Sequence, residues 1–276
     1  MLDLDWFGAM RRAVEAHRAL FDGEPTIAGR NNYEGVGEGG DHALVLDRRA
    51  EDAVFAELEA LHQESGASFV AISEERGEVA FGDGEPEWRV VIDPIDGSMN
   101  VRRTLPAHSL SVAVASGPSM ADVELAYVYE FGAREEFTAR RGEGAWLDGE
   151  KLELDGPDFG LEVVGLESAD PARIAPVVQE LAGEAYRVRV IGSIAITLAY
   201  VAAGRLDAML SARPCRSVDA AGAQLLVTEA GGEIEFVGYG LQDADLGLDA
   251  RYAVLGARNE ELLASVRTAQ ERAPDD

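Results

Sequence analysis

The sequence has few of the features that are typical of secreted proteins and membrane proteins. It contains one cysteine, Cys215, in 276 residues, so no disulfide can form within the chain. Its longest apolar run, residues 194–204, is too short for the roughly 20 residues that cross a bilayer. The first residues lack the basic and apolar regions of a signal peptide. We therefore expect a cytoplasmic protein that does not enter a membrane.

Basic residues are also scarce. Lys151 is the single lysine, and 24 Lys and Arg residues face 51 Asp and Glu, which gives a formal net charge of −27. This acidity argues against recognition of nucleic acid through a basic face. It is typical of a halophilic protein, because high salt screens the repulsion between like charges. An anionic substrate would then be attracted by bound metal rather than by the electrostatic field of the whole protein.

The most informative stretch is residues 89–101, where an apolar, β-branched run is followed by acidic and turn-forming residues. Pro94 has no backbone N–H to continue a ladder, so the strand should end at Asp93. Asp96 follows three residues after Asp93, with the carbonyl of Ile95 between them, and these hard oxygen donors suit Mg²⁺. The backbone N–H groups of residues 97–100 would face an anion at the start of a helix. The same residues also suit an ordinary turn that only ends a strand.

Apolar periodicity predicts a mixed α and β protein, with antiparallel strands in its first part and alternating strands and helices in its second. A glycine-rich stretch, residues 22–42, is typical of a long functional loop, and residues 81–86 of a turn. We expect one unit made of two halves, residues 1–154 and residues 155–276. Helices are expected at 3–21, 48–63, 171–181, 193–203, 220–230 and 259–269. Strands are expected at 69–73, 89–93, 109–116, 123–130, 134–139, 142–146, 161–165, 186–191, 208–210 and 252–255.

The string Asp93-Pro-Ile-Asp-Gly-Ser-Met-Asn100 resembles the signature Asp-Pro-Ile-Asp-Gly-Thr/Ser-x-Asn of the inositol monophosphatase family. That superfamily includes archaeal-type fructose-1,6-bisphosphatases and nucleotide 3′-phosphatases. The resemblance extends over most of the chain and implies a layered αβαβα sandwich, an α+β or α/β fold. It also implies a homodimeric hydrolase of a small phosphorylated sugar or polyol. In that catalytic unit, residues 1–154 would carry most metal motifs, and residues 155–276 the substrate pocket and the last metal ligand. Such an enzyme uses two or three Mg²⁺ ions, for which Mn²⁺ can substitute.

Other segments resemble further parts of that family's site. In Glu74-Glu75, the first glutamate matches a metal ligand that also positions the attacking water. Asp219 matches a ligand of the second metal, although Val218 stands where tryptophan is usual, and Asp47 matches an aspartate that supports the metals. From composition alone, the glutamates suit a solvated turn and both aspartates suit helix N-caps. The resemblance implies metal binding by Glu74, Asp93, Ile95 (carbonyl), Asp96 and Asp219, and catalytic roles for Glu74, Ser98 and Asp47.

The substrate is less narrowly defined by the sequence. Gly192-Ser-Ile-Ala195 resembles a pocket-lining segment at a helix start, and Arg102 and Arg103 either reach a second phosphate or lie in solvent. The four histidines show no ligand spacing, and His17 is expected to pack on the apolar face of the first helix. Inositol-1-phosphate and fructose-1,6-bisphosphate are the leading candidate substrates. The alternative functions are a 3′-phosphoadenosine-5′-phosphate phosphatase and a catalytically silent binding module. The resemblance implies substrate contacts by Asp96, Gly97, Ser98, Ile194, Arg213 and Asp219.

Overall fold

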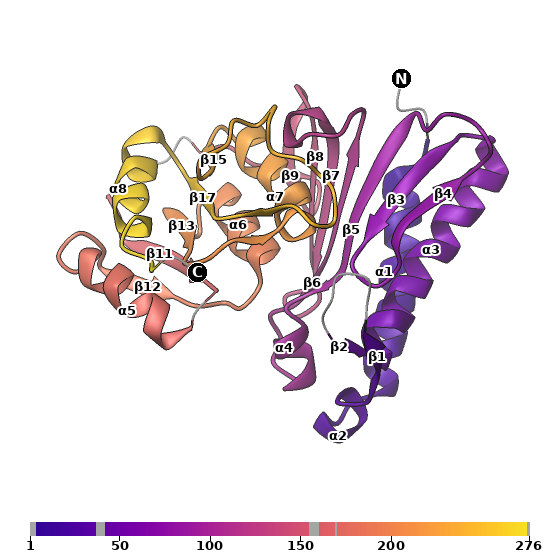
Figure 1. The fold of residues 1–276 in the computed structure, drawn as a ribbon, viewed down its shortest axis with the longest axis horizontal. Helices are drawn as coiled ribbons and strands as arrows, with labels where there is room; N and C mark the ends of the chain where they lie inside the picture. The colour runs from indigo at the N-terminus through magenta and orange to yellow at the C-terminus, as the bar shows by residue number, and fades with distance from the viewer. Residues whose placement is uncertain (1–3, 37–41, 155–159, 169, 275–276) are drawn as a thin grey trace.

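The computed structural model describes residues 4–36, 42–154, 160–168 and 170–274. In these residues, two main β-sheets alternate with layers of helices (Figure 1). The helices are α1 (Trp6–Gly23), α2 (Ile27–Arg30), α3 (Val45–Ser65), α4 (Ser98–Arg102), α5 (Pro171–Glu180), α6 (Ile194–Ala202), α7 (Ser217–Glu229) and α8 (Glu260–Gln270), with a 3₁₀ turn η1 (Met120–Asp122).

An eight-stranded sheet is formed by the first part of the chain and a five-stranded sheet by the second. The larger runs, in spatial order, β10 (Glu150–Lys151), β9 (Gly144–Leu147), β8 (Glu135–Arg140), β7 (Val123–Glu130), β6 (Ser109–Ala115), β5 (Trp88–Asp96), β3 (Phe69–Ser73) and β4 (Gly77–Phe81). The smaller runs β12 (Arg187–Arg189), β11 (Val163–Glu167), β13 (Ala208–Ser211), β17 (Val254–Ala257) and β15 (Glu233–Phe236). Two short pairs complete the strands: β1 (Tyr33–Val36) with β2 (His42–Leu44), and β14 (Cys215–Arg216) with β16 (Arg251–Tyr252).

Helices α1 and α3 cover one face of the large sheet (Figure 1). Alternation along β5 explains this, since Val90 and Ile92 point to that face while Val91 points to the other. On the covered face, the ring of Trp6 stands edge-on to Phe69 with centroids 5.3 Å apart. Burial of these large apolar side chains is the main driving force for the first layer pair.

Helices α6 and α7 fill the space between the two sheets and form one apolar cluster with the large sheet. Their interface is rich in alanine, which lets backbones approach closely. A Cβ added at Gly222 of α7 would stand 3.0 Å from the carbonyl oxygen of Val112 in β6. The middle of α7 is thus held close to β6 of the large sheet, and this contact helps to position the site at the N-terminal end of the helix.

Helices α5 and α8 cover the outer face of the small sheet with a third apolar cluster. The order of layers is therefore α, β, α, β, α, and the expected mixed fold is confirmed. Among the described helices, none combines the length and apolar character that a membrane crossing requires.

Several expected elements differ from those observed. Pro94 does not end its strand, because β5 runs on to Asp96. The four residues of β5 from Asp93 to Asp96 oppose the three residues of β6 from Ser109 to Ser111, so β5 carries one extra residue there. A proline without an N–H is tolerated in such a bulge because the ladder is interrupted there.

Three further corrections concern elements that the sequence did not predict. The stretch 22–42 is not all loop, since α2 and β1 lie in it and β2 begins at its last residue, while residues 37–41 lie outside the described part. Strand β4 occupies residues 77–81, where no strand was expected, and the expected turn follows it. Strand β15 follows α7, where no strand was expected.

Candidate active site

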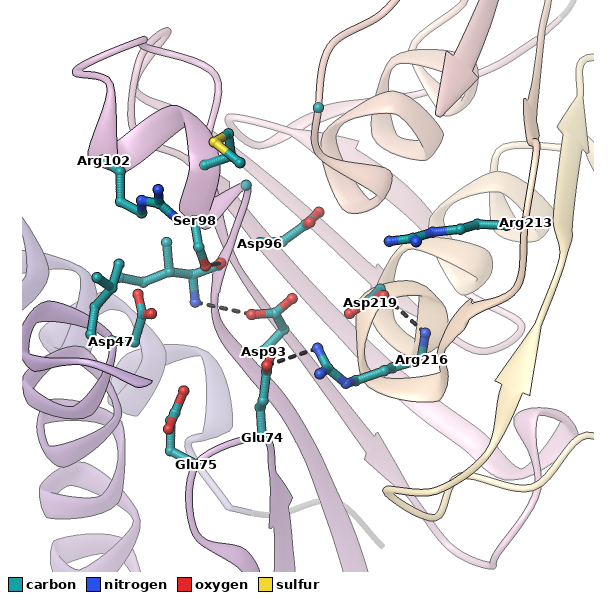
Figure 2. Close-up of a pocket in the computed structure, with 15 residues that line it drawn as sticks. Asp47, Glu74, Glu75, Asp93, Asp96, Ser98, Arg102, Arg213, Arg216 and Asp219 are labelled. Atoms are coloured by element: carbon teal, nitrogen blue, oxygen red, sulfur yellow. Dashed lines mark hydrogen bonds and ion pairs between the residues drawn. The ribbon is translucent and has the colours of Figure 1, made fainter. Parts of the chain in front are cut away.

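Strands β3 and β5 run parallel, so their carboxyl ends reach the same edge of the large sheet. The first turns of α3 and α7 approach this edge from either side. Together they enclose a cavity of about 790 Å³ (Figure 2). It is lined by Leu44, Asp47, Glu74, Glu75, Asp93, Ile95, Asp96, Gly97, Ser98, Met99, Arg102, Gly192, Arg213, Arg216 and Asp219.

The turn between β5 and α4 forms the floor of the cavity. The Ile95 N–H donates to Asp93 Oδ1 at 3.0 Å, and the Ser98 hydroxyl donates to the Ile95 carbonyl at 2.9 Å. Gly97 has φ of 95°, a left-handed conformation that glycine adopts without steric cost. The N–H of Asn100 donates to the Gly97 carbonyl at 2.8 Å. This N–H was expected to face an anion, and the hydrogen bond shows that it does not.

Two buried aspartates and one partly buried aspartate meet at this turn. Asp93 and Asp96 come from β5, and Asp219 from the first turn of α7. Burial raises the pKa of Asp93 well above its usual range, and the neighbouring charges of Asp96 and Asp219 raise it further. Burial also raises the pKa values of Asp96 and Asp219 to about 7. Without a cation, these carboxylates repel one another in a medium that solvates them poorly.

Asp96 and Asp219 also accept hydrogen bonds from neighbouring groups. Asp96 Oδ2 accepts from the Ser193 hydroxyl and from the Ala195 N–H, both at 2.6 Å, which joins β5 to the start of α6. Asp219 Oδ2 accepts from the Arg216 N–H at 3.0 Å. Asp219 therefore satisfies an amide at the start of its helix from inside the first turn, rather than from the N-cap position.

Asp47 and Glu75 face the cavity from the α3 side (Figure 2). Leu44 holds the N-cap of α3, so Asp47 is not the cap. Burial raises the pKa of both carboxyls to about 7, and Glu74 adds to the shift. Within the described residues, Asp47 Oδ1 and Glu75 Oε2 are buried without a hydrogen-bond partner, which is costly for a polar atom.

Three arginines bring positive charge into this acidic cavity. Arg216 Nη1 lies 2.7 Å from Glu74 Oε1. Arg102 Nε donates to the Asn31 side chain at 3.2 Å. Arg213 points into the cavity and forms no hydrogen bond or ion pair with any other described residue (Figure 2). Arg103 is exposed and does not line the cavity.

The expected site residues are thus mostly brought together. Glu74, Asp93, Ile95, Asp96 and Asp219 all line one cavity, as do Asp47, Gly97, Ser98 and Arg213. Ile194 does not line it but is buried in the apolar cluster between the sheets, and Gly192 lines the cavity in its place. Sequence reasoning did not single out Arg216, because its proximity to Glu74 depends on contact between the two halves of the chain.

Comparison with known proteins bears directly on these motifs. A model of the inositol monophosphatase family matches residues 7–271. The chain belongs to the inositol monophosphatase family. This confirms the resemblance drawn from residues 93–100 and the expectation of a phosphatase.

Relatives within the inositol monophosphatase family differ in their names. A fructose-1,6-bisphosphatase/inositol-1-monophosphatase of Methanothermobacter thermautotrophicus is 32% identical over 276 residues, 93% of each chain. The Nus factor SuhB of Escherichia coli is 34% identical over 205 residues, 72% of this chain and 73% of that one. A crystal structure of an inositol monophosphatase–fructose 1,6-bisphosphatase has a TM-score of 0.81 at 26% identity, covering 96% of this chain and 100% of that one.

The family resemblance implies Mg²⁺, and the donor set fits it. The cavity offers carboxylate and carbonyl oxygens, which are hard ligands. Burial raises the pKa values of its carboxyl groups, and a divalent cation would shift these pKa values back down. As the side chains stand, no three histidine, cysteine or acidic residues of the described ranges are arranged as a ready metal centre. Two contacts account for part of this: Glu74 faces Arg216, and Asp96 faces Ser193.

Proposed function

We propose that this protein is an Mg²⁺-dependent phosphomonoester hydrolase that acts on fructose-1,6-bisphosphate, inositol-1-phosphate or both. The observation that carries the proposal is a single cavity that combines buried acidic groups with arginines. Six carboxylates would bind metal or support it there, and the guanidinium group of Arg213, which lines the same cavity, would bind phosphate. Because the cavity draws residues from 1–154 and from 155–276, we treat the two halves as one catalytic unit.

The proposed metal ligands are Glu74, Asp93, the carbonyl of Ile95, Asp96 and Asp219. Mg²⁺, or Mn²⁺ in its place, would activate water and neutralise charge on the phosphate and the leaving oxygen. The chain's own task is to orient these groups. The hydrogen bond from Ser98 to Ile95 fixes the Ser98 hydroxyl oxygen beside the carboxylates, where it can accept from the attacking water together with Glu74. Asp47 and Glu75, on the α3 side of the cavity, would add negative charge that stabilises the bound cations.

Arg213 is the proposed contact for a second phosphate. It faces the carboxylates across the cavity and has no partner in the described residues, so its guanidinium is available for a ligand (Figure 2). The Arg213→Gln variant should raise KM for fructose-1,6-bisphosphate about tenfold and change KM for inositol-1-phosphate less than about twofold. Arg103→Gln, which removes the same charge outside the cavity, is the matched control. Equal effects on both substrates would contradict this role.

Two alternatives have specific counter-observations. A nucleotide 3′-phosphatase would use an aromatic side chain to stack on the base of its substrate. None of the described residues that line the cavity is aromatic, which argues against this function. The name Nus factor SuhB, carried by a relative, favours a binding module instead. The complete set of acidic residues argues for chemistry, since buried carboxylates without a task destabilise a fold.

Phosphate release tests the proposal directly. The three substrates, inositol-1-phosphate, fructose-1,6-bisphosphate and 3′-phosphoadenosine-5′-phosphate, would be compared in high KCl with and without Mg²⁺. Mg²⁺-dependent release from the first two is expected. No release from any of them, with protein shown to be folded by circular dichroism, would favour the binding module.

We also propose a homodimer, which the family resemblance implies. Exposed apolar side chains near α4 support it, because Met99 is 58% exposed and Val190 is 53% exposed. The segments that carry them meet, since the Asn100 side chain donates to the Ile191 carbonyl at 2.8 Å. Met99→Glu should produce a monomer by light scattering, and Val178→Glu, on the outer helix α5, should not.

A further inference from the structure

Arg216 joins two segments of the cavity wall. It is the last residue of β14, directly before α7, and its side chain reaches across the cavity toward the end of β3 (Figure 2). Its Nη1 atom is 2.7 Å from Glu74 Oε1, and its backbone N–H donates to Asp219 Oδ2 at 3.0 Å. One residue therefore contacts two carboxylates that stand far apart in the sequence and are both proposed metal ligands.

The pair differs from an ordinary surface salt bridge. The side chains of Arg216 and Glu74 are only 16% and 21% exposed. Exposed pairs contribute little because water screens them, whereas a partly desolvated pair interacts more strongly. The charge of Arg216 also lowers the pKa of Asp219 and of Glu75, against the upward shift caused by their burial.

The cavity needs such a charge when no metal is bound. Six carboxylates line it against three arginines, so its side chains carry an excess of three negative charges when all are ionised. Arg213 lies in the same cavity but is not bonded to any of these carboxylates. Arg216 forms an ion pair with Glu74, and its backbone N–H donates to Asp219.

We infer that Arg216 is a built-in counter-ion for Glu74, which stabilises the metal-free site and opposes metal loading at this carboxylate. The inference rests on the metal-binding part of the proposed function. A divalent cation on Glu74 would stand beside a guanidinium group, and both compete for the same carboxylate charge. Loading then requires either a weakened Arg216–Glu74 contact or a higher metal concentration. The protein keeps its site folded without metal and fills it only above a threshold.

The test compares Arg216→Gln with Arg216→Lys, and uses Arg213→Gln as a control that removes one positive charge from the same cavity. The full-length protein would be stripped with EDTA and titrated with Mg²⁺ by calorimetry at fixed KCl. Arg216→Gln should lower the dissociation constant at the weakest site at least about tenfold, because a positive charge next to the cation is gone. Arg216→Lys retains the charge and should stay within about threefold of the wild type, as should Arg213→Gln.

Thermal melting of the stripped proteins gives a second readout that does not depend on activity. Without metal, Arg216→Gln should melt several degrees below the wild type, and saturating Mg²⁺ should remove most of that difference. If the variant does not fold without metal, the midpoint of its Mg²⁺-induced folding gives the binding constant.

The possible failures are distinguishable. If the wild type binds Mg²⁺ and Arg216→Gln binds it equally or more weakly, the counter-ion role is overturned while the proposed function stands. The same holds if Arg213→Gln tightens binding as much as Arg216→Gln does. If neither the wild type nor Arg216→Gln binds Mg²⁺, the proposed metal chemistry fails, and this inference fails with it.

Discussion

At the scale of single residues, Asp93 combines a proposed role with a cost. It is 4% exposed, and its pKa is raised by burial and by two neighbouring aspartates. Its Oδ1 atom accepts a hydrogen bond from the Ile95 N–H, and this bond needs only an acceptor oxygen, which an asparagine also has. Removing its charge should therefore affect activity and stability in opposite directions.

The Asp93→Asn variant should lose about a hundredfold or more of its phosphatase activity, since a proposed metal ligand is gone. Its metal-free form should be more stable than the wild type by roughly 1–2 kcal/mol, because one of several repelling buried charges is removed. Phosphate release and melting in EDTA measure the two effects. Substantial turnover by the variant would show that Asp93 is not a metal ligand.

The family resemblance, carried by local strings of residues, identified much of the site but not the contact between Arg216 and Glu74. Asp93 and Asp96 could be predicted because both belong to one local string, whose spacing needs no knowledge of the fold. The bond between Arg216 and Glu74 joins residues 142 positions apart (216 minus 74). Only the packing of α7 against the large sheet brings them together. An arginine in an acidic chain carries no local signal of such a partner.

At the scale of elements, the entry into α4 depends on Gly97. Its φ of 95° is unfavourable for other residues, and an added Cβ would lie 2.9 Å from the Ala107 carbonyl and 3.2 Å from the Gly192 carbonyl. Both neighbours are backbone atoms, so they cannot move aside easily. Gly97 thus permits the close contact between α4 and the segment before α6.

The Gly97→Ala variant should lose about 2–4 kcal/mol of stability, through unfavourable φ and steric contact together. Activity should fall as well, because the turn that holds Asp96 and Ser98 would shift. Gly142→Ala is the control: its φ is 72°, yet nothing lies within 4 Å of an added Cβ. Chemical denaturation of both variants separates the two causes, and equal losses would leave no role for the contacts at Gly97.

The elements that sequence patterns failed to predict share a physical feature. Strand β4 is an edge strand with alternating exposed residues, and its pairing with β3 is what orders it. Strand β5 continues past Pro94 because a bulge against β6 removes the need for its N–H. Long buried helices such as α3 and α7 were predicted, because their apolar periodicity or composition does not depend on a partner strand.

At the scale of the whole molecule, two buried histidines make stability depend on pH. His17 from α1 and His108 before β6 both stack against Phe131, with ring centroids 5.6 Å and 5.4 Å from it. Burial lowers the pKa of each to about 4, from an ordinary value of 6.5. Above pH 6.5 neither the folded nor the unfolded chain protonates them. As the pH falls below 6.5, only the unfolded chain takes up the proton, so stability falls until about pH 4.

Each histidine should therefore lower the free energy of unfolding by about 2 kcal/mol between about pH 7 and about pH 5. In His108→Phe the difference between the two pH values should shrink by about that amount, since the ring stack is kept and one titrating group is removed. Urea unfolding at both pH values measures this, and taking the variant minus the wild type cancels the carboxylates. A pH dependence identical to that of the wild type would contradict the account.

The net charge of −27 determines how the whole molecule should respond to salt. Repulsion among 51 acidic groups opposes folding, whereas surface ion pairs such as Arg11–Glu136 favour it and are also weakened by salt. Each exposed pair contributes at most about 1 kcal/mol, so the surplus of negative charge should dominate. Raising KCl from about 0.1 M to about 1 M shortens the screening length from about 10 Å to about 3 Å. The melting temperature should rise by about 5 °C or more, roughly 2 kcal/mol for a chain of this size. Sucrose, which adds no ions, controls for general solvent effects, and a flat or falling curve in KCl would mean that the acidic surface is not adapted to salt.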